Sequence, residues 1–365
     1  MNSPILFTPL TLRGMTFRNR IAMSPMCQYS AMDGLASDWH LVHLGSRAVG
    51  GAGLVMVEAT AVVPEGRISP GCLGLWDDAH VEPLSRIARF VQAQGAVAGI
   101  QLAHSGRKGS CHASWAGGAP LSAADGSWTV RAPSSLAFDD RSPVPSALEA
   151  AEIDAVVASF RSAALRAVAA GFGVIEIHAA HGYLLHEFLS PLTNRRTDHY
   201  GGSFEHRTRI VRRVACAVRS AVPAQMPLFV RISATDWVEG GWDVAQSVEL
   251  ARWLERDGAD LIDTSSGGLL PDVEIPVTEG YQVSFAQAIR EQTGIPTAAV
   301  GQIERPEHAE EILRGGSAEL IFIGRALLRN PYWSLQAEEM LESMATWPAP
   351  YRSVARPSRL TVVRT

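Results

Sequence analysis

The sequence lacks any apolar run long enough to cross a membrane. A transmembrane helix needs about 18 or more consecutive apolar residues, and no stretch of this chain reaches that length. The first residues also lack the basic segment and the long apolar segment of a secretory signal peptide. We therefore expect a soluble cytoplasmic protein with no membrane partner.

The chain also has very little lysine, no closely spaced pair of cysteines and no excess of positive charge. Lys108 is the only lysine, and because it falls in a long loop rather than on a strand, a Schiff-base aldolase is not expected. The formal net charge of -5 gives no attraction for nucleic acid. No C-x-x-C spacing occurs, so we predict free thiols rather than disulfides. The four cysteines are Cys27, Cys72, Cys111 and Cys216.

What the sequence does contain is a recurring pattern of a helix, a glycine and a short β-branched or aliphatic run. A glycine that ends a helix and is followed at once by a strand is typical of the αβ half of a βα unit. Six runs follow this pattern, and two further apolar runs bring the number of predicted strands to eight. They lie at residues 21–23, 54–57, 97–100, 174–177, 227–231, 261–262, 297–300 and 320–323.

Continuous apolar strands that alternate with helices indicate a parallel sheet. Eight such units fit a closed barrel better than an open doubly wound sheet, and no G-x-G-x-x-G follows the first strand. We therefore predict an α/β fold, a (β/α)8 TIM barrel that forms a single domain over residues 1–365. Residues 105–145, rich in Gly, Ser, Ala and Pro, are expected to form a long loop over the C-terminal mouth after the third strand.

Three helix starts are suggested by local signals. Ser146 with Glu149, and Ser284 with Gln287, have the spacing of capping boxes. Asn330 precedes a proline, as an N-cap residue often does. We therefore expect helices to begin at these three points.

Active sites of such barrels form just after the strands, and polar residues or glycines do occur there. They are residues 24–29, 58–60, Gln101, His104, His178, His181, Arg231, residues 265–268, Gly301 and residues 324–325. Gly301 and Gly324, with Arg325, match the phosphate site common in barrels, where backbone N–H groups and a helix N-terminus accept an anion. Tight turns that need a positive φ would explain the two glycines equally well.

His178 and His181 follow the fourth strand, and two imidazoles there could bind a metal, move protons or donate to a substrate oxygen. Arg231 on the next strand argues against a metal, because a fixed cation repels a metal ion where the dielectric constant is low. An arginine suits an anion that develops on the ligand instead. A reduced flavin is one such anion, and Gln101 could bond its polar rim.

With these residues in view, the chain resembles the old yellow enzyme family of flavin-dependent ene-reductases, and within it the xenobiotic-reductase or thermophilic-like branch. The resemblance runs from about residue 6 to about residue 350. It depends on six motifs, at residues 18–21 (RNRI), 24–29 (SPMCQY), 58–62 (EATAV), 101–108 (QLAHSGRK), 178–183 (HAAHGY) and 196–203 (RTDHYGGS).

The resemblance implies tightly but non-covalently bound FMN at the barrel mouth, with NADPH or NADH as the reductant. It also implies which residues bind the cofactor. They are Ser24, Pro25, Met26 and Cys27 at the flavin ring, Ala59 and Gln101 at its edge, Arg231 at N1/O2, and Gly301, Gly324 and Arg325 at the phosphate.

The same resemblance implies a reaction. His178 and His181 would donate hydrogen bonds to the carbonyl or nitro oxygen of an activated alkene, hydride from flavin N5 would add to Cβ, and Tyr183 would protonate Cα. The implied substrates are α,β-unsaturated ketones and aldehydes, maleimides and nitro compounds. Cys27 is expected to tune the flavin rather than act as a nucleophile, and Tyr29 to donate a hydrogen bond to the substrate.

The chain departs from the family pattern at two places. His206 replaces the asparagine that usually follows Gly-Gly-Ser. The branch also commonly lends an arginine or tryptophan from one subunit's C-terminus to its neighbour's site, and here the tail at 346–365 offers Arg352 or Arg356. We expect a homodimer or homotetramer in which this tail reaches a neighbouring subunit.

Other classes remain as alternatives to an FMN ene-reductase. A different FMN barrel, such as a hydroxyacid oxidase or a dienoyl reductase, comes next, although a dienoyl reductase would carry a cysteine cluster for iron–sulfur ligation and an extra domain. A metal-dependent hydrolase barrel is third, and a binding module without catalysis is last. No metal is expected at the site.

Overall fold

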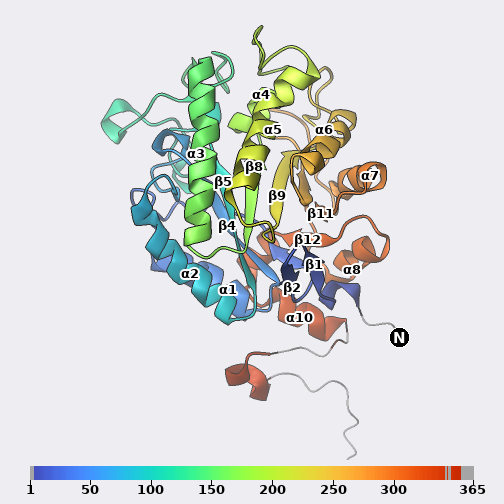
Figure 1. Cartoon of the computed structure of the whole chain (residues 1–365). Coiled ribbons are helices and arrows are strands. Elements are labelled where there is room, and N and C mark those ends of the chain that lie inside the picture. Colours follow the sequence, from blue (N-terminus) through green and yellow to red (C-terminus); the bar gives the residue numbers. More distant parts are fainter. Residues whose placement is uncertain (1–3, 342, 344–346, 355–365) are drawn as a thin grey trace, which may run out of the picture.

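Eight parallel strands close into a barrel at the centre of the molecule, and helices surround it (Figure 1). The structure is a computed structural model that describes residues 4–341, 343 and 347–354. Neighbouring strands follow the order of the chain, so the predicted (β/α)8 barrel is confirmed. The strands are β3 (Ile21–Met23), β4 (Leu54–Ala61), β5 (Val97–Ala103), β8 (Val174–Ala179), β9 (Leu228–Ser233), β10 (Leu261–Ser265), β11 (Thr297–Ala299) and β12 (Leu320–Ile323).

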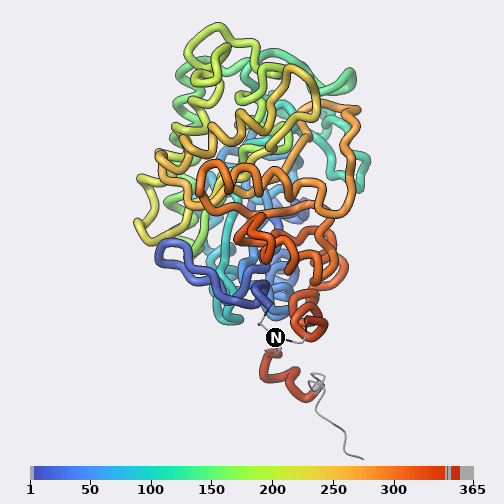
Figure 2. The backbone as a smooth tube through the Cα atoms, turned by 90° about the vertical axis from the view of Figure 1, so that its right-hand side faces the viewer, coloured from blue at the N-terminus to red at the C-terminus, as the bar shows by residue number. Residues whose placement is uncertain are grey.

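Each barrel strand is followed by at least one helix. The longer helices are α1 (Asp38–Val49), α2 (Val81–Ala93), α3 (Ala150–Ala169), α5 (Phe204–Ala221), α6 (Val244–Arg256), α7 (Val283–Thr293), α8 (Pro306–Arg314) and α10 (Trp333–Met340), with the short α4 (Leu184–Leu189) and α9 (Arg325–Arg329). Strand β3 pairs with β12, which brings the two ends of the barrel sequence side by side (Figure 2). Within the described part of the chain, no helix has both the length and the hydrophobicity to span a bilayer.

The interior of the barrel changes from apolar to polar along the strands. At the amino end, the hairpin of β1 (Leu10–Leu12) and β2 (Met15–Phe17) closes the barrel, and the Phe17 ring lies 6.3 Å from that of Phe229. Residues two apart share a face of a strand. The inward positions are Val174, Glu176 and His178 on β8, Phe229, Arg231 and Ser233 on β9, and Leu261, Asp263 and Ser265 on β10. The carboxyl end of the barrel is therefore polar inside.

A second and larger apolar cluster fills the space between the barrel and the helices. Helix α3 contributes Ile153, Val156, Phe160, Ala163 and Ala167, which are spaced three or four residues apart and form one buried face. Burying one large apolar side chain contributes roughly 1.5–3 kcal/mol. This cluster holds the helices against the strands and keeps the strand ends in fixed positions.

The predicted start of α3 is wrong by three residues, since its N-cap is Glu149 rather than Ser146. Ser146 lies in the short strand β7 (Ser146–Ala147), which pairs with β6 (Arg131–Ala132) and so is not available as a cap. The capping box is formed by Glu149 and Glu152 instead, and both are acidic groups that suit the positive end of a helix.

The other two predicted helix starts are also displaced. Ser284 lies inside α7, which begins at Val283. Asn330 ends α9, and its side-chain oxygen accepts from the backbone N–H of Tyr332 in a turn before α10 begins. Asn favours both caps and such turns for the same reason, since its side chain bonds to nearby backbone. Local spacing therefore could not distinguish the two.

Residues 105–145, between β5 and α3, form only short elements. They are η4 (Gly106–Lys108), η5 (Ser114–Ala116), η6 (Ala123–Asp125) and strand β6. In Figure 1 this segment lies at the upper left, at the opposite end of the barrel from the β1–β2 hairpin. Ser114 reaches the cavity described below.

Candidate active site

A cavity of about 310 Å³ opens at the carboxyl end of the barrel. Its lining residues come from the loops and strand ends that the sequence had singled out, with Ser114 as the one unexpected member. They are Pro25, Cys27, Tyr29, Ala59, Gln101, Ser114, His178, His181, Tyr183 and Arg231. The structure thus brings together nine predicted site residues from five different segments of the chain.

The remaining predicted residues lie beside this cavity rather than in its wall. Ser24 is buried and Gly324 adjoins it: a Cβ at Gly324 would lie 3.7 Å from Sδ of Met26 and 4.0 Å from Cβ of Ser24. Arg325, the first residue of α9, is exposed. Gly301 follows β11 with a φ of +118°, a conformation that L side chains rarely adopt. Ser24, Met26 and Gly324 therefore form a separate group at the loop after β3, whereas Gly301 adjoins Tyr281 and Gln282.

The backbone after β8 turns through two left-handed residues. His181 has a φ of +60° and Gly182 a φ of +71°, and a non-glycine residue in this region costs about 1–3 kcal/mol. Hydrogen bonds hold the turn: His181 N donates to Oγ of Ser233 at 2.9 Å, and Gly182 N donates to Nδ1 of His186 at 2.9 Å. Because Nδ1 of His186 accepts, its hydrogen lies on Nε2, which is 2.9 Å from Oδ1 of Asp236.

The same turn packs directly against the loop after β10. A Cβ at Gly182 would lie 2.1 Å from the carbonyl oxygen of Gly268, and a Cβ at Gly268 would lie 2.8 Å from Cα of His181. Glycine is required at both positions because the two backbones touch. Nζ of Lys108 then bridges the two loops, since it donates to O of His181 at 2.9 Å and to O of Gly268 at 2.8 Å.

Lys108 also lies over two aromatic rings. Its Nζ is 5.1 Å from the ring centroid of Tyr183 and 4.9 Å from that of Phe138. Burial lowers the pKa of Lys108 to about 8, against an opposing effect of Glu187. Because it falls in a loop, sequence reasoning assigned this lysine no role, yet it fixes the backbone that carries His181.

The two histidines of the cavity are neutral. Burial is the main cause that lowers the pKa of both His178 and His181 well below the ordinary value, and the charge of Arg231 lowers both further. Their rings lie edge to face, with centroids 5.1 Å apart. Each neutral imidazole therefore has one N–H to donate and no charge to offer.

Ser265 influences which nitrogen of His181 carries the hydrogen. Its Oγ is 2.7 Å from Nε2 of His181 and 3.3 Å from Oε1 of Gln282, and it has one hydrogen to donate. Gln282 Oε1 already accepts from Ser266 at 2.7 Å. The shorter contact favours donation from Ser265 to Nε2, which leaves the hydrogen of His181 on Nδ1.

Three acidic side chains in the cavity wall are held in their protonated forms. Burial is the largest cause that raises the pKa of Tyr183, of Tyr29 and of Cys27 above the ordinary value. The ring of Tyr183 lies 5.2 Å from that of His178. Tyr29 has a left-handed φ of +46° and packs edge-on against the exposed Trp115 at 5.4 Å. The cavity thus presents neutral phenols and a neutral thiol.

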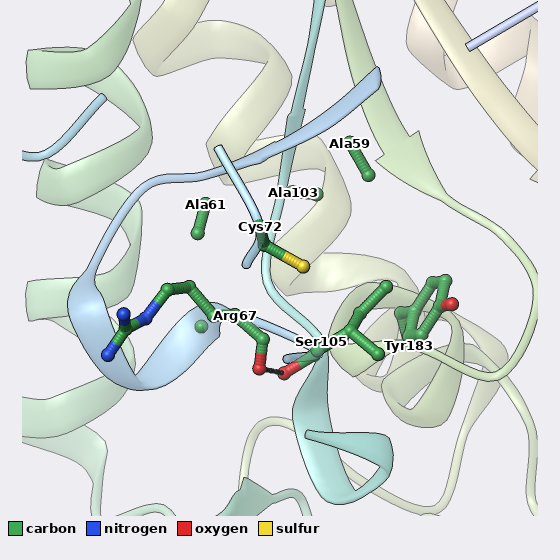
Figure 3. A pocket seen from close by; sticks show the side chains of 9 residues that line it. Ala59, Ala61, Arg67, Cys72, Ala103, Ser105 and Tyr183 are labelled. Carbon is green, nitrogen blue, oxygen red and sulfur yellow. Dashed lines mark hydrogen bonds between the residues drawn. The ribbon is translucent and has the colours of Figure 1, made fainter. Parts of the chain in front are cut away.

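Tyr183 also lines a second, much smaller cavity of about 10 Å³ (Figure 3). Cys72 and Ser105 lie on its other side, and the hydroxyl of Ser105 donates to the backbone oxygen of Arg67 at 2.8 Å. This space is at most that of one water molecule. Tyr183 is therefore packed on one side and open to the main cavity on another.

The segment after β3 is supported by a buried carboxylate that the sequence did not reveal as such. Glu58 lies at a bulge of β4 and accepts from the backbone N–H of Gln28 at 3.0 Å. Oε1 of Glu58 is 3.3 Å from Nε2 of His40. Burial raises the pKa of Glu58, and the bond to His40 opposes this. These contacts hold the backbone on which Cys27 and Tyr29 lie.

Gln101 and Arg231 of the cavity wall contact two acidic side chains outside it, Glu176 and Asp263, and all four are nearly or fully buried. Glu176 was missed because it stands within an apolar strand. The two-residue period of side chains along a strand could have revealed it, because each of three neighbouring strands carries a charged residue at an inward position. Across the described residues, no cluster of three His, Cys, Asp or Glu side chains could hold a metal ion.

The two predicted departures from the family pattern lie away from the cavity wall. His206, in the first turn of α5, has Nδ1 3.2 Å from the backbone oxygen of Gly201. Arg352 is exposed on η7 (Ala349–Val354), which Figure 1 shows below the barrel, at the hairpin end. Arg356 lies outside the described residues. A role for this tail in a neighbouring subunit remains a prediction.

Comparison with known proteins relates the chain to flavin oxidoreductases. Residues 5–343 match the model of the NADH:flavin oxidoreductase / NADH oxidase family. An NADPH dehydrogenase of Bacillus subtilis (strain 168) is 47% identical over 348 residues, which are 95% of this chain and 98% of that protein. An NADPH dehydrogenase of Listeria innocua is 48% identical over 95% of this chain and 98% of its own. Among solved structures, morphinone reductase is similar with a TM-score of 0.78 at 29% identity, covering 96% of this chain and 92% of its own.

Proposed function

The chain belongs to the NADH:flavin oxidoreductase / NADH oxidase family, the old yellow enzyme family, and on this basis we propose that it reduces the C=C bond of activated alkenes. It is an oxidoreductase that uses FMN, with a nicotinamide as the reductant. The proposed substrates are α,β-unsaturated ketones and aldehydes, maleimides and nitro compounds. The observation that carries the proposal is that two neutral imidazoles and a neutral phenol face one cavity.

The polar atoms around the cavity fit a flavin. Oγ of Ser24 and Nδ1 of His178 are buried with no hydrogen-bond partner among the described residues. Each such atom costs about 1–3 kcal/mol if it stays unpaired. Gln101 donates its amide hydrogen to Glu176 and so keeps its amide oxygen free to accept. A flavin ring carries N–H, N and C=O groups along one edge and can pair with donors and acceptors of this kind.

The group next to the β3 loop fits the phosphate of FMN. The space beside Gly324 is open, because a Cβ there would meet nothing closer than 3.7 Å. Arg325 is the exposed first residue of α9 and adds a cation at the same point. Backbone N–H groups of a first helical turn favour an anion. We propose that Gly301, Gly324 and Arg325 bind this phosphate.

FMN supplies hydride transfer when it is bound. We propose that His178 and His181 donate hydrogen bonds to the carbonyl or nitro oxygen of the alkene, since neutral imidazoles donate without adding charge. Negative charge grows on this oxygen during reaction, so the two hydrogen bonds strengthen in the transition state. Because the backbone around His181 is fixed, the site needs little rearrangement to reach the transition state.

We propose Tyr183 as the general acid that delivers a proton to Cα of the substrate. Its raised pKa keeps the phenol protonated throughout the working pH range, and its ring lies next to His178. Tyr29 is proposed as a further hydrogen-bond donor to the substrate. Cys27 is proposed to adjust the flavin environment, because its raised pKa leaves little of the nucleophilic thiolate.

Lys108→Met should slow the alkene half-reaction about tenfold at pH 7, equivalent to about 1.4 kcal/mol in the barrier. The substitution leaves the carbonyl groups of His181 and Gly268 without their donor and loosens the turn that positions His181. In the wild type, the rate should fall as the pH rises through about 8, where Lys108 loses its proton. Stopped-flow reoxidation across this pH range measures both effects.

Glu187 provides the control for this pH dependence, because burial raises its pKa to about 8 as well. A Glu187→Gln variant should keep the fall in rate if Lys108 is responsible. Lys108→Arg keeps a cation and should lose less activity than Lys108→Met. An unchanged pH profile in Lys108→Met would rule out the lysine as its source.

The function is tested first by the cofactor and then by the acceptor. Purified protein should be yellow, release FMN on heat denaturation, and bleach when NADPH is added without air. Addition of an enone, an enal, a maleimide or a nitroalkene to the bleached enzyme should restore the colour and yield the saturated product. A protein that contains FMN and is bleached, yet is reoxidised by none of these alkenes, would refute the proposed substrate class.

A further inference from the structure

Two carboxyl groups lie one layer deeper in the barrel than the histidines. Glu176 on β8 and Asp263 on β10 are both 0% exposed. Each stands two residues before a side chain of the site, His178 and Ser265, and so faces the same way along its strand. Arg231 lies on β9, the strand between β8 and β10; it pairs in register with Asp263, and its Nε is 3.1 Å from Oδ2 of Asp263. This layer therefore contains two acids and one cation.

The hydrogen bonds of this layer show where a further proton is needed. Gln101 Nε2 donates to Oε1 of Glu176 at 2.8 Å, so this oxygen is an acceptor. Oε2 of Glu176 and Oδ1 of Asp263 have no hydrogen-bond donor among the described residues, and Oδ2 of Asp263 has only its ion-pair contact with Arg231. The two carboxyl groups are close enough to interact, and burial raises the pKa of each, with the charge of Asp263 raising that of Glu176 further.

We propose that Glu176 and Asp263 share one proton and together hold a single negative charge against Arg231. The proton lies on Oε2 of Glu176, which donates it to Asp263. Two ionised carboxylates would leave a net charge of −1 in a buried layer, and two protonated ones would leave Arg231 without a counter-charge. One shared proton leaves no net charge and gives the unpaired oxygens a hydrogen bond.

Glu176 is then a positioning residue for the cofactor. By accepting from Gln101, it fixes the amide so that the oxygen, not the nitrogen, is left for a ligand. The shared negative charge also offsets part of the positive charge of Arg231, and so determines the electrostatic effect of Arg231 on a neighbouring group. This inference rests on the proposed function, in which Gln101 and Arg231 contact FMN.

A double-mutant cycle on the FMN-loaded protein tests the shared charge. If two groups hold one charge, removing either carboxyl leaves the charge on the other. Glu176→Gln and Asp263→Asn should therefore each leave the midpoint potential of FMN within a few millivolts of wild type. The double variant loses the charge and should raise the potential by at least about 30 mV, a tenfold change for a two-electron couple. The effects are then strongly non-additive.

Two ionised carboxylates predict a different result. Each single variant would raise the potential by a similar amount, and the double variant by the sum, which would overturn the proposal. Glu205→Gln on α5 removes one negative charge at the surface and is the matched control, with no expected shift. Infrared difference spectra of wild type against Glu176→Gln add a readout that does not need the double variant: they should show a carboxylic acid band, and carboxylate bands in its place would overturn the proposal.

Arg231→Gln separates this inference from the proposed function. If Arg231 contacts FMN, its loss should lower the midpoint potential. No change in this variant would mean that the proposed contact between Arg231 and FMN is wrong. A lower potential in Arg231→Gln with no shift in the double carboxyl variant would overturn only the shared charge.

Discussion

Replacing Tyr183 with phenylalanine should slow the alkene half-reaction by about a hundred- to ten-thousandfold, the usual contribution of a general acid. The raised pKa of the phenol keeps it protonated, and its ring adjoins His178 in the cavity. Reduction of the flavin by NADPH requires no proton from this group and should proceed at nearly the wild-type rate. Anaerobic stopped-flow measurement of the two half-reactions separates these effects.

Tyr332→Phe is the matched control, because this tyrosine precedes α10, outside the cavity wall. Both of its half-reactions should match those of the wild type. A Tyr183→Phe enzyme that reduces alkenes as fast as the wild type would show that the proton comes from another donor. Tyr29, also protonated in the cavity, would be the next group to test.

His178→Ala should lower the rate of the alkene half-reaction by about a hundred- to thousandfold, as loss of one oxyanion donor does. It should also raise KM for the alkene, since the same hydrogen bond binds the substrate. The protein should stay yellow because FMN is bound by other residues. His178→Asn retains an N–H donor and should recover part of the lost rate.

The pH dependence provides a second test of the histidines. Burial and Arg231 lower the pKa of His178 and His181 well below the ordinary value, so both stay neutral between about pH 6 and pH 8. The rate should show no inflection near the ordinary pKa of histidine. His206→Ala, outside the cavity, is the control for histidine removal and should leave the rate unchanged. An inflection that vanishes in His178→Ala would mean that a charged imidazole is the donor.

The barrel could be predicted because its signal is repeated. Six apolar runs after glycines and two further apolar runs each indicate a strand weakly, but together they fit one architecture, and each of the eight forms a strand of the barrel. The helix starts at Ser146, Ser284 and Asn330 rested on single local signals. Those side chains are used in a strand, inside a helix and in a turn, respectively. The spacing of nearby residues in the sequence does not show whether such a side chain will cap a helix or lie in a strand, a helix or a turn.

All members of the cavity wall except Ser114 could be named in advance, because loop residues after parallel strands converge. Their supporting residues could not. Glu176 and Asp263 lie within apolar strands, and only the order of the strands shows that β8 and β10, which carry them, lie on either side of β9 with Arg231. Lys108 is in a loop whose path the sequence does not determine. Its two carbonyl partners are 73 and 160 residues away in the chain.

The contact between Gly182 and Gly268 limits how this enzyme can be redesigned. Loop exchange is a common way to change which substrates a barrel accepts. Here the loop after β8, which bears His181, cannot be transplanted alone, because its backbone packs directly against the loop after β10. A donor loop that lacks glycine at either point would push both apart and displace His181. Chimeras should therefore exchange the two loops as one unit.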